Sequence, residues 1–491
     1  MTEALRSPVD FLSQLFPALP HREDLLSYEE WWEADGRAIS DATDRAGTPW
    51  LKMFDHTGAR VDEILYPPEY WRMLQTGYRT GALWRAFEEN SLFPGFLWIY
   101  VTSFYDPGLA CPYTVSLATA AAIAKHATPD LRDRFLPNML RRDGTAWQGA
   151  TWMTEIKGGS DLGANVETTA IPTGNRWSLT GDKYFASNAG AGLAVVAARP
   201  DGAPAGVKGV ALFLVPRRKE NGSLNYFIRR MKDKIATRSV PTGEIELRAS
   251  EAWLLGRAEQ GIYNVLEVLN LSRVANSFGS VAVAQRALAE AHCFAGQRIA
   301  FGKPILQHAL LRKQFEERER DLRAAAGLAW EAAKLFDEVS EERPPYSAKY
   351  HLFRLVAHLA KSWTAELAVQ TAKWGMEVHG GLGVLGEFSA ERWLREAMIL
   401  AIWEGTSHRQ ALDGLEVMER KQVHHALFER LAPLTSREEL GKMSARTVAL
   451  MALPSEQRET QADILFEELA RFAATTLARS QPPAGEGRVR Q

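Results

Sequence analysis

The stretch RWSLTGDKYFAS, residues 176–187, alternates apolar and polar side chains with a period of two. This period is typical of a β-strand that buries one face. Three further runs, LAVVAARP, GVALFLVP and GEIELRAS, follow it between clusters rich in Gly, Pro and Asn. The segment from about 149 to 255 is therefore predicted to be a β domain.

The segments on both sides of this β domain have a helical period. Between about 65 and 145, apolar residues recur three and four positions apart, with a break at Pro129 that predicts a helix-turn-helix. From about 258 onward, long Ala-rich stretches with the same period predict an antiparallel helical bundle. This order favours a mainly helical α+β fold and disfavours a Rossmann fold, in which strands and helices alternate.

We predict four parts on this basis. They are an N-terminal extension and helical domain (1–148), a middle β domain (149–255), a C-terminal helical bundle (256–420) and a short helical C-terminal extension (421–491). The last residues, GEGRVRQ, are poor in apolar side chains, so the end of the extension is expected to fray.

Composition limits the possible functions. The chain has 491 residues, of which 46% are hydrophobic, and a formal net charge of −2, which gives no overall attraction for a polyanion. Its two cysteines, Cys111 and Cys293, are too few for a disulfide framework and are not spaced as metal ligands. No run approaches the roughly 18 to 20 apolar residues of a membrane span, and the N-terminus lacks a signal-peptide pattern. A cytoplasmic protein without a metal site or membrane span is expected.

Several familiar catalytic motifs do not fit the sequence. GQRIAFGKP, from Gly296, resembles a P-loop but has five residues between its glycines, and Pro304 stands where Ser or Thr would bind magnesium. No Gly-x-Ser-x-Gly motif occurs. The neighbouring His424 and His425 lie in a polar helical stretch and are expected at the surface.

Two stretches of the β domain could bind a ligand. TWMTEIKGGSDLGAN, residues 151–165, contains a Gly-Gly-Ser-Asp turn whose backbone N–H groups and hydroxyls are free to face a planar polar molecule. The alternative is an ordinary turn. Phe185 and Ser187 share one strand face and could flank a ring system, although core packing of Phe185 is an alternative.

A third stretch, LAIWEGTSHRQ at 400–410, places one carboxylate, Glu404, in an apolar run. Ser407 and Gln410 fit a capping box, which predicts a helix that starts near His408 and whose positive end could hold a phosphate. The same helix end would favour the ionised form of Glu404, whereas poor hydration beside Trp403 would raise its pKa toward that of a working base, and the sequence leaves both effects open. The alternative for Glu404 is a turn carboxylate in solvent.

Five motifs together resemble one family. MTEIKGGSD, DKYFASN, QRIAFGKPI, MEVHGGLG and IWEGTS occur in the order and approximate spacing of the acyl-CoA dehydrogenase superfamily, over about residues 60–420. The resemblance implies a helical domain, a β domain and a helical bundle around FAD. FDHTGARVDEILYPPEYW, GGSD, KDKIATRS and AWLLG are similar to the AidB-type branch in particular.

The resemblance implies a set of cofactor-binding residues. The loop and strand of the β domain would contact the flavin ring, and the residues around Glu404 would bind the ADP half. Arg298 and Phe301 would reach the FAD of a neighbouring subunit, with Gly380 and Gly381 at the same interface. A homo-oligomer, dimer or tetramer, with shared FAD sites is therefore expected. The implied FAD-binding residues are Met153, Thr154, Ser160, Phe185, Ser187, Arg298, Phe301, Gly380, Gly381, Trp403, Gly405, Thr406 and His408.

The resemblance also implies a reaction. Glu404 corresponds to the base that removes the proton α to a thioester carbonyl while hydride leaves the β carbon for flavin N5. Ser272 stands where some members carry the base on an earlier helix, and it cannot serve. Arg273 and Ser160 correspond to positions near the substrate. The expected partners are an acyl-CoA thioester or a related small molecule, with an electron-transfer flavoprotein as a candidate electron acceptor.

Some features leave alternatives open. Ile156, Lys157, Asn270 and His379 depart from the family pattern, and His379 could be either a packed histidine or a catalytic one. The AidB branch suggests binding of duplex DNA, with a role against alkylation damage. Residues 420–491 contain eleven Lys or Arg and nine Asp or Glu, a balance that disfavours DNA. A third alternative is a flavin oxidase acting on a non-CoA substrate such as a nitroalkane.

Overall fold

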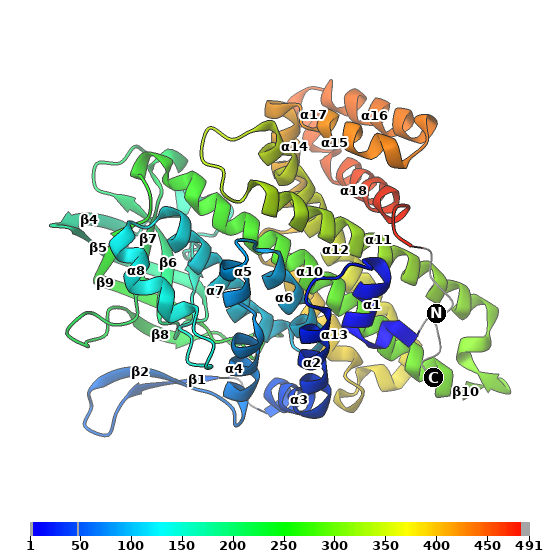
Figure 1. Cartoon of the computed structure of the whole chain (residues 1–491), viewed down its shortest axis with the longest axis horizontal. Helices are drawn as coiled ribbons and strands as arrows, with labels where there is room; N and C mark the ends of the chain where they lie inside the picture. Colours follow the sequence, from blue (N-terminus) through cyan, green and yellow to red (C-terminus); the bar gives the residue numbers. More distant parts are fainter. Residues whose placement is uncertain (1–2, 47–48, 483–491) are drawn as a thin grey trace. The chain divides into compact units, whose positions relative to one another are not determined.

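The structure is a computed structural model that describes residues 3–46 and 49–482 (Figure 1). The chain forms two compact units. Unit 1 contains the residues up to Glu29 and those from Arg273 on, and unit 2 contains Glu30–Ser272. The 37-residue helix α10 (Gly261–Gln297) includes the boundary at 272/273. Most of the segment predicted to fray lies outside the described residues.

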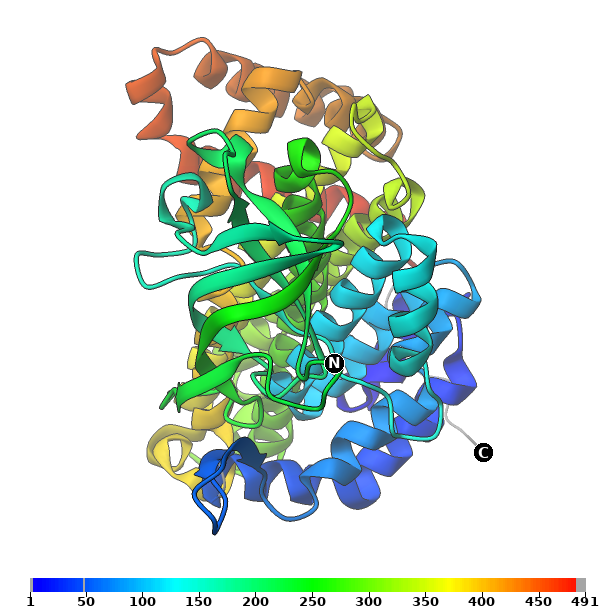
Figure 2. The same ribbon diagram turned by 90° about the vertical axis from the view of Figure 1, so that its left-hand side faces the viewer.

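The β domain predicted from the period of two is present in unit 2. Strand β6 pairs with β4, β4 with β5, β5 with β9, β9 with β7, and β7 again with β6, so the pairings form a closed circuit. Figure 2 shows the strands of this domain in blue-green to green. Strand β3 adds to β6 in parallel and β8 adds to β9. The strands are β3 (Thr151–Trp152), β4 (Thr169–Thr173), β5 (Arg176–Ser187), β6 (Leu193–Pro200), β7 (Ala211–Pro216), β8 (Phe227–Met231) and β9 (Thr242–Leu254).

Apolar side chains of these strands form one core. It includes Trp152, Leu179, Phe213, Tyr226 and Ile245, each at most 1% exposed. The Tyr226 hydroxyl donates to two backbone carbonyls, so its burial leaves no polar group unpaired. Because side chains alternate between the two faces of a strand, this core fixes which residues of β5 point outward.

The predicted helical segment before the β domain is also confirmed. The break at Pro129 separates α7 (Pro107–His126) from α8 (Pro129–Met139), and Asp106 caps α7 by accepting from Leu109 N–H. Helix α7 is long and apolar enough to cross a membrane, but 83% of that window is buried inside the protein. The other helices here are α3 (Arg37–Ala46), α4 (Tyr70–Thr80), α5 (Trp84–Glu88) and α6 (Phe93–Tyr105).

A β-hairpin that the sequence reasoning did not foresee lies between α3 and α4. Strand β1 (Trp50–Phe54) pairs antiparallel with β2 (Arg60–Leu65). The turn between them is held by Asp55, whose carboxylate accepts from Thr57 and Ala59. The signal was available, because Asp-His-Thr-Gly between two apolar runs is typical of a hairpin.

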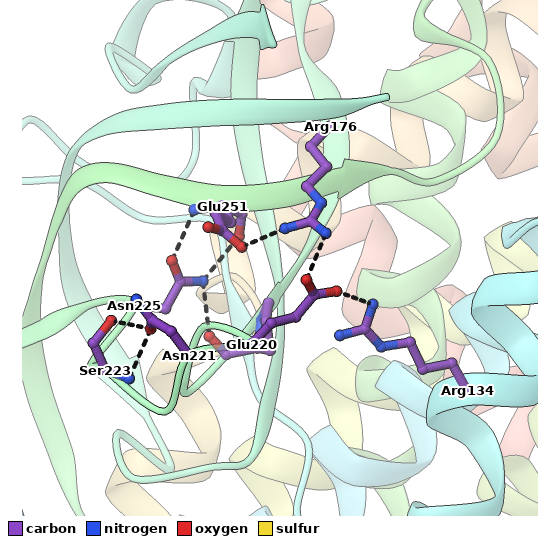
Figure 3. A network of polar contacts seen from close by, with 8 residues as sticks. Arg134, Arg176, Glu220, Asn221, Ser223, Asn225 and Glu251 are labelled. Carbon is purple, nitrogen blue, oxygen red and sulfur yellow. Dashed lines mark hydrogen bonds and ion pairs between the residues drawn. The ribbon is translucent and has the colours of Figure 1, made fainter. Parts of the chain in front are cut away.

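A network of polar contacts lies in unit 2 between α8 and the β domain (Figure 3). Glu220 accepts from Arg134 of α8 at 3.0 Å and from Arg176 of β5 at 2.8 Å. Arg176 also pairs with Glu251 of β9 at 2.9 Å. The Asn225 side chain bonds the backbone at Glu251 through both its oxygen and its nitrogen. All four carboxylate and guanidinium groups of this network remain partly in solvent.

Unit 1 contains the predicted helical bundle and helical extension. Helix α12 packs against α11, α13, α14 and α18. His424 is buried, so its predicted surface position is wrong, whereas His425 is exposed. The helices are α1 (Pro8–Leu15), α11 (Ala309–Val339), α12 (Ala348–His379), α13 (Ala390–Ile402), α14 (Ser407–Lys421), α15 (His424–Leu431), α16 (Arg437–Met451), α17 (Ser455–Glu459) and α18 (Ala462–Ala478). Helix α2 (Arg22–Trp31) includes the other boundary between the units, at 29/30.

Candidate active site

Two of the stretches singled out from the sequence lie side by side in unit 2. The backbone N–H of Tyr184, near the end of β5, donates to the carbonyl of Thr154 at 3.0 Å. The indole Nε1 of Trp152 donates to the carbonyl of Ser187 at the same distance. These bonds hold the loop after β3 against the last residues of β5.

The surface formed by this loop and strand is suited to a planar ring. Phe185 is 58% exposed, so the alternative that it packs into the core is wrong. The hydroxyl of Ser187 lies 3.3 Å from that of Thr242, and Ser160 is exposed. Met153 is buried beneath the loop. An exposed aromatic ring with hydroxyls beside it offers both a flat apolar face and hydrogen bonds to a polar edge.

A buried ion pair anchors the loop. Lys183 Nζ donates to Glu155 Oε1 at 2.6 Å, and the Thr168 hydroxyl donates to the same oxygen at 2.7 Å. The backbone N–H of Glu167 donates to Oε2. Burial opposes ionisation of Glu155, but Lys183 and these donors lower its pKa. The sequence reasoning missed this pair, although a Lys inside the alternating strand β5 was a signal.

In unit 1, Glu404 lies in the tight turn between α13 and α14. Glu404 has φ +58° and Gly405 has φ +100°, so the chain reverses through two left-handed residues. The Oε2 atom of Glu404 is buried and accepts no hydrogen bond from the residues that the structure describes. The alternative of a carboxylate in solvent is therefore wrong. Burial raises the pKa of Glu404 to about 7, against the opposing effect of the cations Arg273 and Lys361.

The helix after this turn starts differently from the prediction. Helix α14 begins at Ser407 with Thr406 as its N-cap residue, and Ser407 does not cap it. The reason is that the Ser407 hydroxyl donates to the carboxylate of Glu366 on α12. The predicted capping box is therefore wrong. The hydroxyl of Thr406 lies 3.2 Å from the ring of His408, which brings those two predicted residues together at the helix N-terminus.

Arg273 lies next to Glu404, as the resemblance implied. Its Nε donates to the Glu404 carbonyl at 3.4 Å, and its Nη2 lies 3.5 Å from Asp413 of α14. Arg409 pairs with the same Asp413. Arg273 is 7% exposed, so its charge acts in a poorly hydrated region. The sequence reasoning missed Asp413, since its distance of nine residues from Glu404 matched no motif.

The residues expected at a subunit interface are unusually exposed. Phe301 is 96% exposed at φ +50°, an uncommon backbone for an aromatic residue. Arg298 is exposed as well, and a Cβ added at Gly380 or Gly381 would meet nothing within 4 Å. His379 is instead buried, with Nδ1 2.7 Å from the Gly375 carbonyl, as the packed alternative predicts.

Three family profiles match the chain in sequence order. "Adaptive response protein AidB N-terminal domain" matches residues 27–143, "Acyl-CoA dehydrogenase, middle domain" matches 150–250, and "Acyl-CoA dehydrogenase, C-terminal domain" matches 259–418. The chain is an AidB-like member of the acyl-CoA dehydrogenase superfamily. It is therefore an FAD-dependent oxidoreductase.

Individual relatives agree with this assignment. "Acyl-CoA dehydrogenase family member 11" of Caenorhabditis elegans is 28% identical over 88% of this chain and 74% of its own length. The solved structure "Bd2924 apo-form" is 29% identical, covers 97% of this chain and 96% of its own, and superposes with a TM-score of 0.87. The structure of C. elegans ACDH-11 in complex with C11-CoA is 24% identical, covers 97% and 87% of the two chains, and has a TM-score of 0.84.

The side chains present fit the cofactor of this AidB-like dehydrogenase. The exposed ring of Phe185, the hydroxyls of Ser187 and Thr242 and the backbone at Thr154 would suit a flavin ring. In residues 3–46 and 49–482, no group of three or more His, Cys, Asp or Glu could hold a metal ion.

Proposed function

We propose that this protein catalyses α,β-dehydrogenation of an acyl-CoA thioester, with Glu404 as the base that removes the α proton. The observation that carries the proposal is the buried, unbonded Oε2 of Glu404. A carboxylate with a pKa of about 7 can both exist as the ionised base near neutral pH and hold the proton afterwards. Glu404 is the base in the IWEGTS motif, and Ser272 cannot replace it.

The proposed reaction removes a proton from the α carbon and a hydride from the β carbon. Glu404 accepts the α proton on its unbonded oxygen, and the electron pair of that C–H bond forms the new C=C bond. Bound FAD would accept the hydride from the β carbon, which leaves a 2-enoyl thioester. Arg273 and Lys361 would stabilise the ionised carboxylate before transfer. Ser160 and Arg273 are the proposed substrate contacts.

The proposed partners follow from the family and from the exposed residues. A CoA thioester is supported by the C11-CoA bound to the C. elegans ACDH-11 protein. A homo-oligomer, dimer or tetramer, is supported by the nearly complete exposure of Phe301 and by the open positions beside Gly380 and Gly381. An electron-transfer flavoprotein as acceptor and a cytoplasmic location complete the proposal.

Anaerobic flavin bleaching tests the reaction. The purified protein should be yellow and should lose its flavin absorbance with a saturated acyl-CoA of suitable chain length. Glu404→Gln should keep FAD and lose at least about 10²-fold in the bleaching rate, the range for a general base. Glu319→Gln, the same change at a buried carboxylate paired with Arg323, is the control and should bleach normally. Wild-type protein that no acyl-CoA bleaches would refute the proposal.

DNA protection by an AidB-type protein is a weaker proposal, because the basic residues of the extension are neutralised. Most are already ion-paired with a carboxylate, so few are free to release counterions from a phosphate backbone. A gel shift at low salt would restore this alternative, and peroxide release without a carrier would favour an oxidase. The ion-paired basic residues are Arg420, Arg430, Lys442, Arg446, Arg458, Arg471 and Arg479.

A further inference from the structure

The turn that carries Glu404 is held by side chains from other helices. Asn276 of α10 donates to the Leu400 carbonyl at 3.1 Å. Gln410 donates to the carbonyls of Glu404 and Gly405 at 2.8 and 3.1 Å. The Leu400 carbonyl lies in the last turn of α13 and the other two follow the helix end, so none has a partner inside that helix and external donors must satisfy them. Neutral amides are sufficient for this task.

One of the donors is the side-chain nitrogen of a lysine, a group that can carry a charge. Lys361 of α12 is fully buried, and its Nζ donates to the carbonyls of Ala401 and Gly405. It therefore bridges the last turn of α13 to the residue after Glu404. Burial of a lysine ammonium costs several kcal/mol unless a negative charge compensates it. Two carbonyl dipoles, which amides satisfy elsewhere in the same turn, do not explain the presence of a charge.

The acids around Lys361 leave Glu404 as its principal counter-charge. Asp413 is shared by Arg273 and Arg409, and the carboxylate of Glu366 accepts from Ser407. Two carboxylates act on the charge of Lys361, Glu404 with the larger effect and Glu366 with the smaller one. Burial lowers the pKa of Lys361 to about 7, while Glu404 opposes that shift. The charged groups that act directly on this pair are Arg273 from α10 and Glu366 from α12. Arg354 from α12 and Arg409 and Asp413 from α14 act in turn on Arg273, which also acts on His358 of α12.

We propose that Lys361 is a positioning residue for Glu404, which fixes the turn that aims the carboxylate and supplies the positive charge that favours its ionised form. The mechanistic part of this inference rests on the proposed function, because Glu404 must be ionised to accept the α proton. Lys361 touches neither substrate nor cofactor in this proposal, and it acts only through Glu404.

Infrared titration of the FAD-loaded protein tests the proposal without a substrate. The C=O stretch of protonated Glu404 is identified by its loss in Glu404→Gln, and its titration midpoint is compared between variants. Lys361→Met should move the midpoint upward by about 1 to 3 units, the usual effect of an opposite charge at close range. Lys361→Arg retains a positive charge and should keep the midpoint at or below that of wild type.

A matched control separates charge from support of the turn. Gln410→Met removes two neutral donors to the same turn and should leave the midpoint close to wild type. The proposal is overturned if Lys361→Met leaves the midpoint unchanged, or if Gln410→Met shifts it equally. Should Lys361→Met not fold, Lys361→Gln carries the same expectation. If Lys361→Met moves the Glu404 midpoint as expected but no acyl-CoA bleaches the wild-type flavin, only the proposed function is refuted. If an acyl-CoA bleaches the wild-type flavin but Lys361→Met leaves the midpoint unchanged, only the role of Lys361 is refuted.

Discussion

Two glutamates in this protein each lie between two cations, yet their pKa values move in opposite directions. Glu220, in the network of Figure 3, accepts from Arg176 and Arg134, and hydrogen bonds from these guanidinium groups lower its pKa. Glu404 lies near Arg273 and Lys361, and its pKa is raised to about 7. The difference is hydration, since Glu220 is exposed and Glu404 Oε2 is buried without a hydrogen bond.

The comparison separates two uses of the same residue types. At Glu220, direct hydrogen bonds connect α8 to the β domain, and solvent screens the charges. At Glu404, the neighbouring cations contact the backbone of the turn instead of the free oxygen. That oxygen remains available to a proton. A carboxylate that is already hydrogen-bonded to its cations is a structural link, whereas an unbonded one near cations can act as a base.

The largest expected effect is at Glu155, a buried carboxylate that accepts a hydrogen bond directly from its cation, Lys183. Lys183→Met would leave Glu155 buried without its partner, and we expect a loss of about 3 to 5 kcal/mol in the free energy of unfolding. Urea unfolding of the FAD-loaded protein measures it. The double variant Lys183→Met with Glu155→Leu should recover part of the loss. A loss no greater than that of an exposed pair would show that burial does not set the strength of this contact.

The next largest effect concerns the pH dependence of stability at Glu404. The pKa of Glu404 is raised from 4.5 to about 7 in the folded protein, so protonation of Glu404 stabilises the fold. This contribution to the free energy of unfolding is complete below about pH 4.5 and is lost as the pH rises through 7. Relative to wild type, Glu404→Gln should therefore gain stability between about pH 5 and pH 8, by up to about 3 kcal/mol. Unfolding curves across this range measure the difference. Parallel pH profiles for the two proteins would contradict a raised pKa.

The comparison of the two regions extends to the backbone at two glycines, one next to Glu404 and one near Glu220. Gly405 (φ +100°) and Gly222 (φ +82°) both have a left-handed backbone, so alanine at either position should cost about 1 to 2 kcal/mol of strain. A Cβ at Gly405 would lie 2.5 Å from the Gln410 amide nitrogen, whereas a Cβ at Gly222 would meet nothing within 4 Å. Gly405→Ala should thus be the more destabilising by about 0.5 to 1.5 kcal/mol, for the loss of the Gln410 hydrogen bonds. Equal losses would mean that Gln410 does not hold the turn.

Much of the fold was predictable because periodicity depends on local burial. The period of two located β5, β6, β7 and β9 of the β domain, although not the shorter β3, β4 and β8, and Pro129 marked the break between α7 and α8. The hairpin of β1 and β2 was missed because most residues of its strands are half-buried on both faces, which leaves little alternation to detect.

The candidate site was predictable only in part. Motifs indicated Glu404 and Phe185, but the capping role assigned to Ser407 was wrong because Glu366, 41 residues earlier, competes for its hydroxyl. Lys361 lies 43 residues before Glu404, and Asp413 belongs to the following helix. Contacts between helices of a bundle depend on packing that a single sequence pattern does not encode.

The smallest effect is expected at Glu220. Glu220→Gln removes the charge between Arg134 and Arg176, but both guanidinium groups also lie over the ring of Trp253, at 5.2 and 5.5 Å from its centroid. These cation–π contacts and the pair between Arg176 and Glu251 remain, so the two arginines keep their positions. We expect the urea midpoint to stay close to wild type and any change to shrink further in high salt. A destabilisation as large as that of Lys183→Met would show that exposure does not weaken this network.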